Sequence, residues 1–274
     1  MNHILITTAL QAEARPLIDH FQLEQKQLNK EIFYYQKGEI ICLTTGVGEK
    51  NVHNRLGTFL HETNSSNSIL LNIGIAGGNK EHTEIGRMYM VNKITGNNGK
   101  VWLPDMLLKT GLPEMPLNTV SKGITDGGHI YDGLVDMEAA AIFETAVQCL
   151  PVHRLIILKI VSDHMDVVLD SSKQVIPLMT KQLPEIKRII EILKNSNLVK
   201  ESLLSNANKN LLNELSTSLK LTTTQSHQLR DKVEGYVVLK SGDISFLSLY
   251  DDSVVNSKQE RTKIFHEICS RLSA

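Results

Sequence analysis

The chain has no block of charge of one sign. Its 274 residues include 29 Lys or Arg and 30 Asp or Glu, which gives a net charge of about −1. Acidic and basic residues are interspersed, as on an ordinary solvated surface. Because a basic patch or stripe is the usual footprint of a nucleic-acid-binding protein, we expect no nucleic acid among the partners.

Cysteine is scarce, and its placement argues against a metal. Cys42, Cys149 and Cys269 are far apart, and no CxxC pair or Cys/His cluster has the spacing of zinc ligands. Cys42 and Cys149 lie in apolar runs and fit small core residues. We therefore predict no metal site and no cofactor, and a reducing, cytoplasmic location.

Long apolar runs are also missing. No segment approaches the ~20 apolar residues of a membrane span, so we expect no contact with a membrane. The run Met1–Thr7 has no basic region and no small-residue cleavage site, so we do not expect it to be a signal peptide.

Short apolar runs alternate with helix-like segments in the first two thirds of the chain. We expect strands at residues 3–8, 32–35, 40–44, 68–75, 87–94 and 154–162, and helices starting at residue 9 and at 51–61, 139–148 and 183–195. This alternation predicts an α/β domain whose sheet is covered on both faces.

The composition changes near Asn195. Beyond it, residues 206–220 have helical leucine spacing, a threonine-rich start at Thr222 fits a second helix, and residues 261–272 fit a terminal helix. Residues 236–239 and 244–249 fit a hairpin around Gly242. We therefore predict two domains, residues 1–195 and 196–274, the second a small α+β appendage of unknown role without a recognisable chemical motif.

Three acidic residues stand at expected junctions between strands and helices. Glu13 lies in the first turn of a helix, Glu138 lies in the run Leu134–Ile142 (LVDMEAAAI), and Asp163 ends an apolar strand after Ser162. Each one alone fits a helix cap or a side chain that complements a helix dipole. Because ligands gather at the carboxyl ends of strands in α/β sheets, the three together predict one shared pocket.

Glycines follow the expected strand at residues 68–75. Gly74, Ala76 and Gly77 leave room for the backbone to approach a ligand closely. A tight turn that serves packing is the simpler explanation for the glycines taken alone. Their spacing is not that of a dinucleotide-binding loop.

Five segments in this order resemble the purine nucleoside phosphorylase/nucleosidase superfamily. They are Ala9–Glu13, Gly46–Gly48, Gly74–Gly78, Val135–Ala141 and Ile160–Asp163. The chain is most similar to the methylthioadenosine/S-adenosylhomocysteine nucleosidases, over roughly residues 1–195. The resemblance implies a three-layer α/β fold around a mixed, partly barrel-like sheet, and a homodimer or higher homo-oligomer. It implies cleavage of the N-glycosidic bond of a purine nucleoside, adenosine-type and possibly 5′-modified.

The resemblance also implies the catalytic residues. Glu13 would activate the attacking water, Asp163 would protonate the purine, and Ser162 would hold that aspartate. Loss of the base builds negative charge on the purine, and an acid that neutralises such charge typically contributes about 10²–10⁴-fold.

Substrate-binding residues follow from the same resemblance. Glu138 would bind the ribose hydroxyls and stabilise the positive charge that develops on the sugar. Met137 would pack beneath the sugar, and Gly74, Ala76 and Gly77 would line the pocket.

Several positions differ from the family pattern. Ile75 replaces a serine of the glycine motif, and Lys159 replaces an arginine often found before the serine-aspartate pair. Residues 79–133, which usually supply the walls around the base, are shorter than in the family, and Ile124 and Tyr131 are candidates for stacking on the base.

The nucleophile is water or phosphate. A phosphorylase usually aims arginines at a glycine loop, whereas the loop Gly46–Lys50 carries Glu49 beside its only close cation. Glu13 would also repel phosphate. We favour hydrolysis, with phosphorolysis and a non-catalytic nucleoside-binding module as alternatives.

Overall fold

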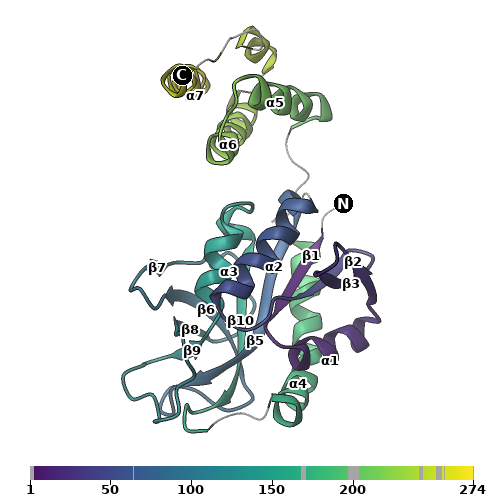
Figure 1. Ribbon diagram of the computed structural model, residues 1–274, viewed down its shortest axis with the longest axis vertical. Coiled ribbons are helices and arrows are strands. Elements are labelled where there is room, and N and C mark those ends of the chain that lie inside the picture. Colours follow the sequence, from purple (N-terminus) through teal and green to yellow (C-terminus); the bar gives the residue numbers. More distant parts are fainter. Residues whose placement is uncertain are drawn as a thin grey trace. The chain divides into compact units, whose positions relative to one another are not determined.

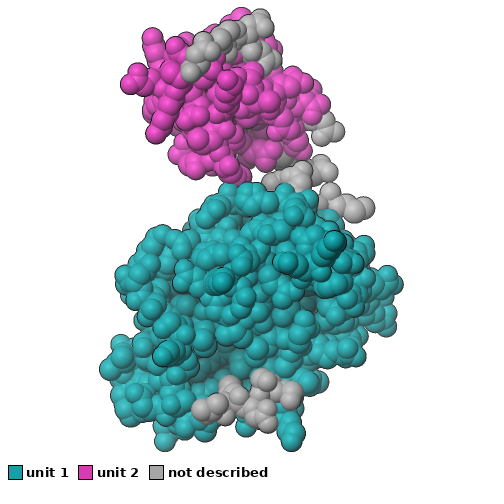
Figure 2. Space-filling model, viewed as in Figure 1, with its two compact units in different colours: residues 1–199 teal, residues 200–274 magenta. Residues whose placement is uncertain are grey.

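The structure is a computed structural model, and it divides the chain into two compact units. It describes residues 3–63, 65–167, 171–196, 204–240, 243–250, 255 and 257–273. The units comprise residues 1–199 and 200–274 (Figure 2). Residues 197–203, which follow the predicted boundary between residues 195 and 196, lie outside the described residues.

The first unit contains one ten-stranded mixed sheet (Figure 1). Its strands are β1 (Ile4–Thr8), β2 (Glu24–Gln27), β3 (Phe33–Lys37), β4 (Ile40–Thr44), β5 (Ile69–Gly78), β6 (Met88–Thr95), β7 (Val101–Trp102), β8 (Glu114–Thr119), β9 (Leu134–Asp136) and β10 (Leu155–Asp163). β1 runs parallel to β4 and β5, and β5 runs parallel to β10. These central strands are buried along nearly their whole length, which explains why their sequences are mainly apolar.

Five of the strands close into a ring. Hydrogen-bonded neighbours run in the order β10, β6, β8, β9 and β5, and β5 also pairs with β10. The strands β1, β4, β3 and β2 extend from β5 as an open wing. The predicted mixed, partly barrel-like sheet is therefore confirmed.

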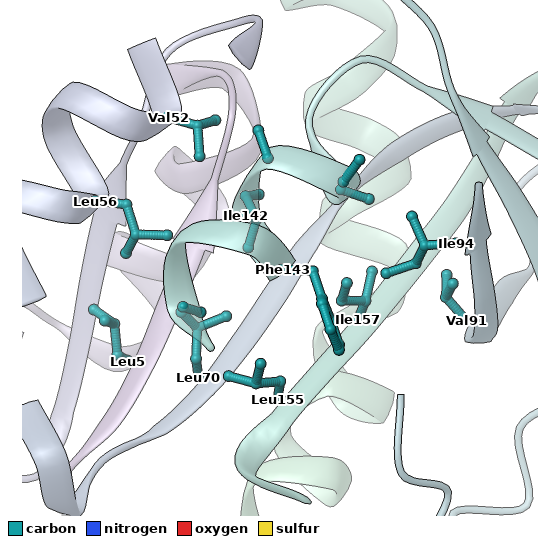
Figure 3. Packing of buried hydrophobic residues seen from close by; sticks show 14 of the residues in the cluster. Leu5, Val52, Leu56, Leu70, Val91, Ile94, Ile142, Phe143, Leu155 and Ile157 are labelled. Atoms are coloured by element: carbon teal, nitrogen blue, oxygen red, sulfur yellow. The ribbon is translucent and has the colours of Figure 1, made fainter. Parts of the chain in front are cut away.

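Helices cover both faces of the sheet, which gives three layers. α2 (Glu49–Glu62) packs against α3 (Ala139–Ala146), and α1 (Gln11–Phe21) packs against α4 (Ser171–Asn195). Figure 3 shows side chains of α2 and α3, among them Leu56 and Phe143, meeting strand residues such as Leu70 in the first of two cores. The second core lies on the side of α1 and α4. Burying each such side chain stabilises the fold by about 1.5–3 kcal/mol.

α4 is longer than predicted. It begins at Ser171 rather than near residue 183, and it contains Pro177 and Pro184. The prediction placed Pro184 in the first turn because proline removes a hydrogen bond inside a helix. Val175 and Met179, which precede Pro184, are completely buried in the second core. This packing compensates for the prolines.

The second unit is helical in its described residues. It contains α5 (Asn206–Ser218), α6 (Thr223–Lys240), the 3₁₀ helix η4 (Ser245–Tyr250) and α7 (Lys258–Ser273) around an apolar cluster of its own. The predicted cap of the second helix is present, because the Gln225 N–H donates to Thr222 Oγ1 at 3.2 Å.

The hairpin predicted in this unit is wrong. Its first strand lies in α6 and its second in η4, while Gly242 lies outside the described residues. Val233, Tyr236 and Val237 have helical spacing and pack in the cluster, so packing outweighs their preference for strands. The appendage is therefore helical rather than α+β where it is described. None of the described helices of either unit is long and apolar enough to cross a membrane.

Candidate functional site

A cavity of about 450 Å³ opens at the carboxyl ends of β5, β9 and β10. The predicted site residues that line it are Glu13, Ala76, Gly77, Met137, Glu138, Ser162 and Asp163. Gly74 is not a lining residue. Of the two candidates for stacking on a base, Ile124 lines the cavity and Tyr131 does not.

Glu13 is fixed between α1 and β5. Its Oε2 accepts the N–H groups of Ala9 and Leu10 at 2.8 and 2.9 Å, and its Oε1 accepts the Ile75 N–H at 2.9 Å. The side chain is buried, which raises the pKa of the carboxyl although these hydrogen bonds and the charge of Lys159 lower it. Gly74 leaves room for this carboxylate, because a Cβ at position 74 would lie 2.9 Å from Glu13 Oε1.

Glu138 lies at the start of α3. Its Oε1 accepts the Gly48 N–H at 2.9 Å, and the residue is 7% exposed. Burial raises the pKa of this carboxyl to about 7, with Asp136 adding to the rise and Lys159 opposing it. Gly48 thus ties the glycine loop before α2 to the carboxylate.

Asp136, which also lines the cavity, forms a buried ion pair with Lys159. Lys159 Nζ is 2.9 Å from Asp136 Oδ2, and both side chains are almost fully buried. Asp136 also accepts Thr119 Oγ1–H at 2.8 Å and the Ala139 N–H at 2.9 Å. Burial alone would lower the pKa of Lys159, but Asp136, Glu138 and Glu13 together raise it. In the sequence Lys159 is only a departure from a family pattern, and no local pattern points to Asp136 as its partner.

Asp163 ends β10, and its carboxylate is oriented by its neighbours. Ser162 Oγ lies 2.6 Å from Asp163 Oδ2 and 3.1 Å from the Ala76 carbonyl oxygen. The Met165 N–H donates to Asp163 Oδ1 at 2.7 Å. Ser162 therefore contacts the Asp163 carboxylate, and the role that the resemblance implies for it stays a prediction.

Met165 has an unusual backbone. Its φ is 60°, a region that non-glycine residues rarely adopt, and its side chain is buried. A Cβ on Gly77 would lie 2.6 Å from Met165 Cγ, and one on Gly128 would lie within contact distance of its sulfur, so both glycines make room for it. The Gly127 N–H donates to the Met165 carbonyl at 2.8 Å. Met165 thereby connects the segment 121–132 to Asp163, a connection that the sequence analysis missed.

The remaining lining is mostly aliphatic. It includes Leu10, Val47, Ile75, Val120, Val135 and Val167. None of the described lining residues is Lys, Arg or His. Within the described residues, no group of three or more His, Cys, Asp or Glu side chains is placed to hold a metal ion.

Comparisons with known proteins place this geometry in a known fold. No family model and no curated protein matches the chain. Among solved structures, the 5′-methylthioadenosine nucleosidase of Arabidopsis thaliana is similar with a TM-score of 0.62 at 18% identity, covering 72% of this chain and 98% of that chain. The futalosine hydrolase of Helicobacter pylori has a TM-score of 0.60 at 14% identity, covering 69% and 97%.

A third similar structure contains a ligand. It is the 5′-methylthioadenosine/S-adenosylhomocysteine nucleosidase of Neisseria meningitidis in complex with methylthio-immucillin-A, with a TM-score of 0.58 at 16% identity, covering 72% of this chain and 100% of that chain. This chain has a nucleosidase-like fold. The predicted fold is thereby confirmed.

The site in this nucleosidase-like fold combines an apolar cavity with acidic groups on its walls, of which Asp136 is paired with Lys159. Glu13 approaches from α1, Glu138 from the start of α3, and Asp163 from the end of β10. Carboxylates suit the hydroxyls and developing positive charge of a sugar, and the aliphatic walls suit an uncharged ring.

Proposed function

We propose that this chain hydrolyses the N-glycosidic bond of a purine nucleoside. The observation that carries the proposal is the meeting of three buried acidic side chains, Glu13, Glu138 and Asp163, on one largely aliphatic cavity. Cleavage requires stabilisation of positive charge on the ribose, protonation of the departing base and activation of a nucleophile. Three separately held carboxyl groups can divide these tasks.

Glu138 is the candidate for the sugar. Its Oε1 accepts the Gly48 N–H, and the carboxylate has further acceptor capacity for ribose hydroxyls. Met137, its neighbour, also lines the cavity and offers an apolar surface beneath a sugar ring. A negative charge there stabilises the oxocarbenium-like transition state more than the neutral nucleoside.

Asp163 is the candidate for the base. Ser162 and the Met165 N–H fix both of its oxygens, so a proton on this carboxyl would be presented in a constant direction. Glu13 is the candidate for the nucleophile. The three N–H groups that hold it leave it fixed and facing the cavity, where a water can be oriented and deprotonated.

Water is the favoured nucleophile because the cavity offers phosphate little stabilisation. None of its described lining residues is a cation, and the carboxylates would repel a phosphate dianion. The purine and its 5′ substituent are proposals that the aliphatic lining supports, since it favours an uncharged group over a charged one.

The test is release of free base from a panel of purine nucleosides, including 5′-thio-substituted adenosines, with and without phosphate. We expect release that does not depend on phosphate, with ribose rather than ribose 1-phosphate as the sugar product. Release that requires phosphate would replace hydrolysis by phosphorolysis. Stoichiometric binding without release by the parent protein would indicate a binding module instead.

A matched pair of variants strengthens the panel. Glu13→Gln keeps the shape of the side chain and removes its capacity as a base, whereas Glu62→Gln changes an exposed glutamate at the end of α2. We expect Glu13→Gln to lose most of the turnover and Glu62→Gln to retain it. Equal turnover in the two variants would exclude Glu13 as the general base.

A further inference from the structure

Lys159 is a buried charge to which the proposed chemistry gives no task. It lies on β10 and points to the same face of the sheet as the core residues Ile157 and Val161, because side chains on a strand alternate between faces. It is not a lining residue of the cavity. Burying an ammonium group is strongly unfavourable unless other groups compensate it, so its surroundings explain its presence.

The direct partner of Lys159 joins two parts of the site. Asp136 accepts from Lys159 Nζ and, through the same Oδ2, from the Ala139 N–H in the first turn of α3. Its other oxygen accepts from Thr119 on β8, and Thr119 Oγ1 accepts the Ala140 N–H at 3.0 Å. This network connects β10, which ends at Asp163, to the junction of β9 and α3, which carries Glu138.

The charges around Lys159 are all negative. Glu13 from α1, Asp136 from β9 and Glu138 from the start of α3 act on its ammonium. On the neighbouring strands its register partners are Tyr89 of β6, whose hydroxyl accepts the Glu84 N–H at 3.0 Å, and Gly74 of β5, against which the Glu13 carboxylate lies. One ammonium therefore serves three carboxyl groups, of which only Asp136 contacts it directly.

We propose that Lys159 is a positioning residue for the proposed nucleosidase reaction, which favours the charged forms of Glu13 and Glu138 and holds the Glu138 junction in register with the Asp163 strand. The inference rests on the proposed function for its role in turnover, but its electrostatic part can be measured without a substrate. Without the ammonium, three carboxyl groups share one buried region, and the repulsion between neighbouring negative charges favours protonation of the carboxylates. Glu138 would then become charged only at a higher pH than in the parent.

The electrostatic part predicts opposite shifts for the two members of the ion pair. In Lys159→Met the midpoint of the Glu138 titration should rise by about 1–3 pH units, the usual effect of losing a near opposite charge. In Asp136→Asn it should fall, because a like charge is removed. Lys159→Arg keeps the charge and should titrate like the parent. Lys194→Met is the matched control, because Lys194 in the last turn of α4 pairs with Glu39 on the surface. This variant should leave the Glu138 midpoint unchanged.

These midpoints can be followed by ¹³C NMR on protein labelled at its glutamate carboxyl carbons. Glu138→Gln and Glu13→Gln assign the two signals by their disappearance. Equal Glu138 midpoints in the parent and in Lys159→Met would overturn the electrostatic part, whether or not any nucleoside is cleaved. This outcome is distinct from failure of the proposed function, in which the parent cleaves nothing but its carboxyl groups still titrate as expected.

The double variant Lys159→Met/Asp136→Asn separates positioning from charge and guards against misfolding. Removing both members of a buried pair is often tolerated where removing one is not. With both charges gone, the Glu138 midpoint should return toward that of the parent, while turnover at that midpoint stays at least about tenfold lower because the link to α3 is lost. Parent-like turnover in the double variant would overturn the positioning part. If Lys159→Met does not fold, Asp136→Asn and the double variant still decide both parts.

Discussion

Gly74 offers a sharp steric test of the position of Glu13. In Gly74→Ala the new Cβ would lie 2.9 Å from Glu13 Oε1 and 3.3 Å from its Cδ, whereas ordinary contact begins at 3.4 Å, so the carboxylate must retreat by about 0.5 Å. The backbone at this position does not have a positive φ, and an alanine is therefore not strained by its own conformation. The carboxylate cannot retreat freely, because three N–H groups hold it.

The size of the effect follows from these contacts. Weakening the hydrogen bond from the Ile75 N–H should cost about 1–3 kcal/mol of stability, since a buried group is left poorly paired. For turnover, displacement of a catalytic group by a fraction of an ångström should lower the rate by about 10- to 100-fold, given that 1 Å can cost 10²-fold. Both changes come from one added methyl group outside the cavity wall.

The assay combines thermal unfolding with base release, and the chain supplies its own control. Gly57→Ala adds the same methyl group in the interior of α2, where a Cβ meets only Thr145 Cγ2 at 3.7 Å. There we expect unchanged turnover and a gain of up to about 1 kcal/mol from helix propensity. In a Glu13→Ala background, Gly74→Ala should lower the free energy of unfolding much less than in the parent, because the clashing carboxylate is gone. An equal cost in both backgrounds would refute the reasoning.

Three other predictions address the acidic groups and the second unit. Glu138→Gln should lower turnover by about 10²–10³-fold with folding retained. Because burial raises the pKa of this carboxyl from 4.5 to about 7, the folded chain keeps a proton between these pH values that the unfolded chain loses. The free energy of unfolding, measured by urea titration, should therefore fall between about pH 4.5 and about pH 7 by more in the parent than in the variant. Asp163→Asn should bind purine nucleosides as the parent does but cleave them far more slowly. The loss of cleavage rate should be smaller for a nitrophenyl riboside, whose leaving group needs no proton. Equal losses of rate on both substrates would mean that Asp163 is not the acid. A chain that ends at residue 199 should keep its circular dichroism and its nucleoside binding, and precipitation or loss of binding would show that the first unit depends on the second.

Much of the first unit could be predicted because its central strands give strong local signals. β1, β4, β5 and β10 are buried on both faces, so their sequences are mainly apolar, and the glycines and acidic residues stand at or near their ends. β2, β8 and β9 could not be predicted in this way. β2 is wholly exposed and polar, β8 contains Pro116, and β9 has three residues. Their conformations depend on strands that are distant in the sequence.

The candidate site shows the same limit. A single lysine within the run Leu155–Asp163 was a visible sign that a buried partner must exist, but no local pattern identified Asp136 as that partner. The positive φ of Met165 could not be read from its residue type, because it depends on the space left by Gly77 and Gly128. In the second unit, the run from Tyr236 to Leu239 has strand-forming residues, and only the packing of α6 decides that it is a helix.

Closure of the five-stranded ring has a consequence for the order of events when a substrate arrives. β10 is paired on both sides, by β5 and by β6, so its amides should exchange with solvent only when the whole unit opens. The segment 121–132 contributes Gly123, Ile124 and Thr125 to the cavity without belonging to a helix or a strand, so it should exchange much faster. Asp163 would thus be in place before any ligand enters, whereas the wall formed by residues 123–125 should adjust more readily to the ligand.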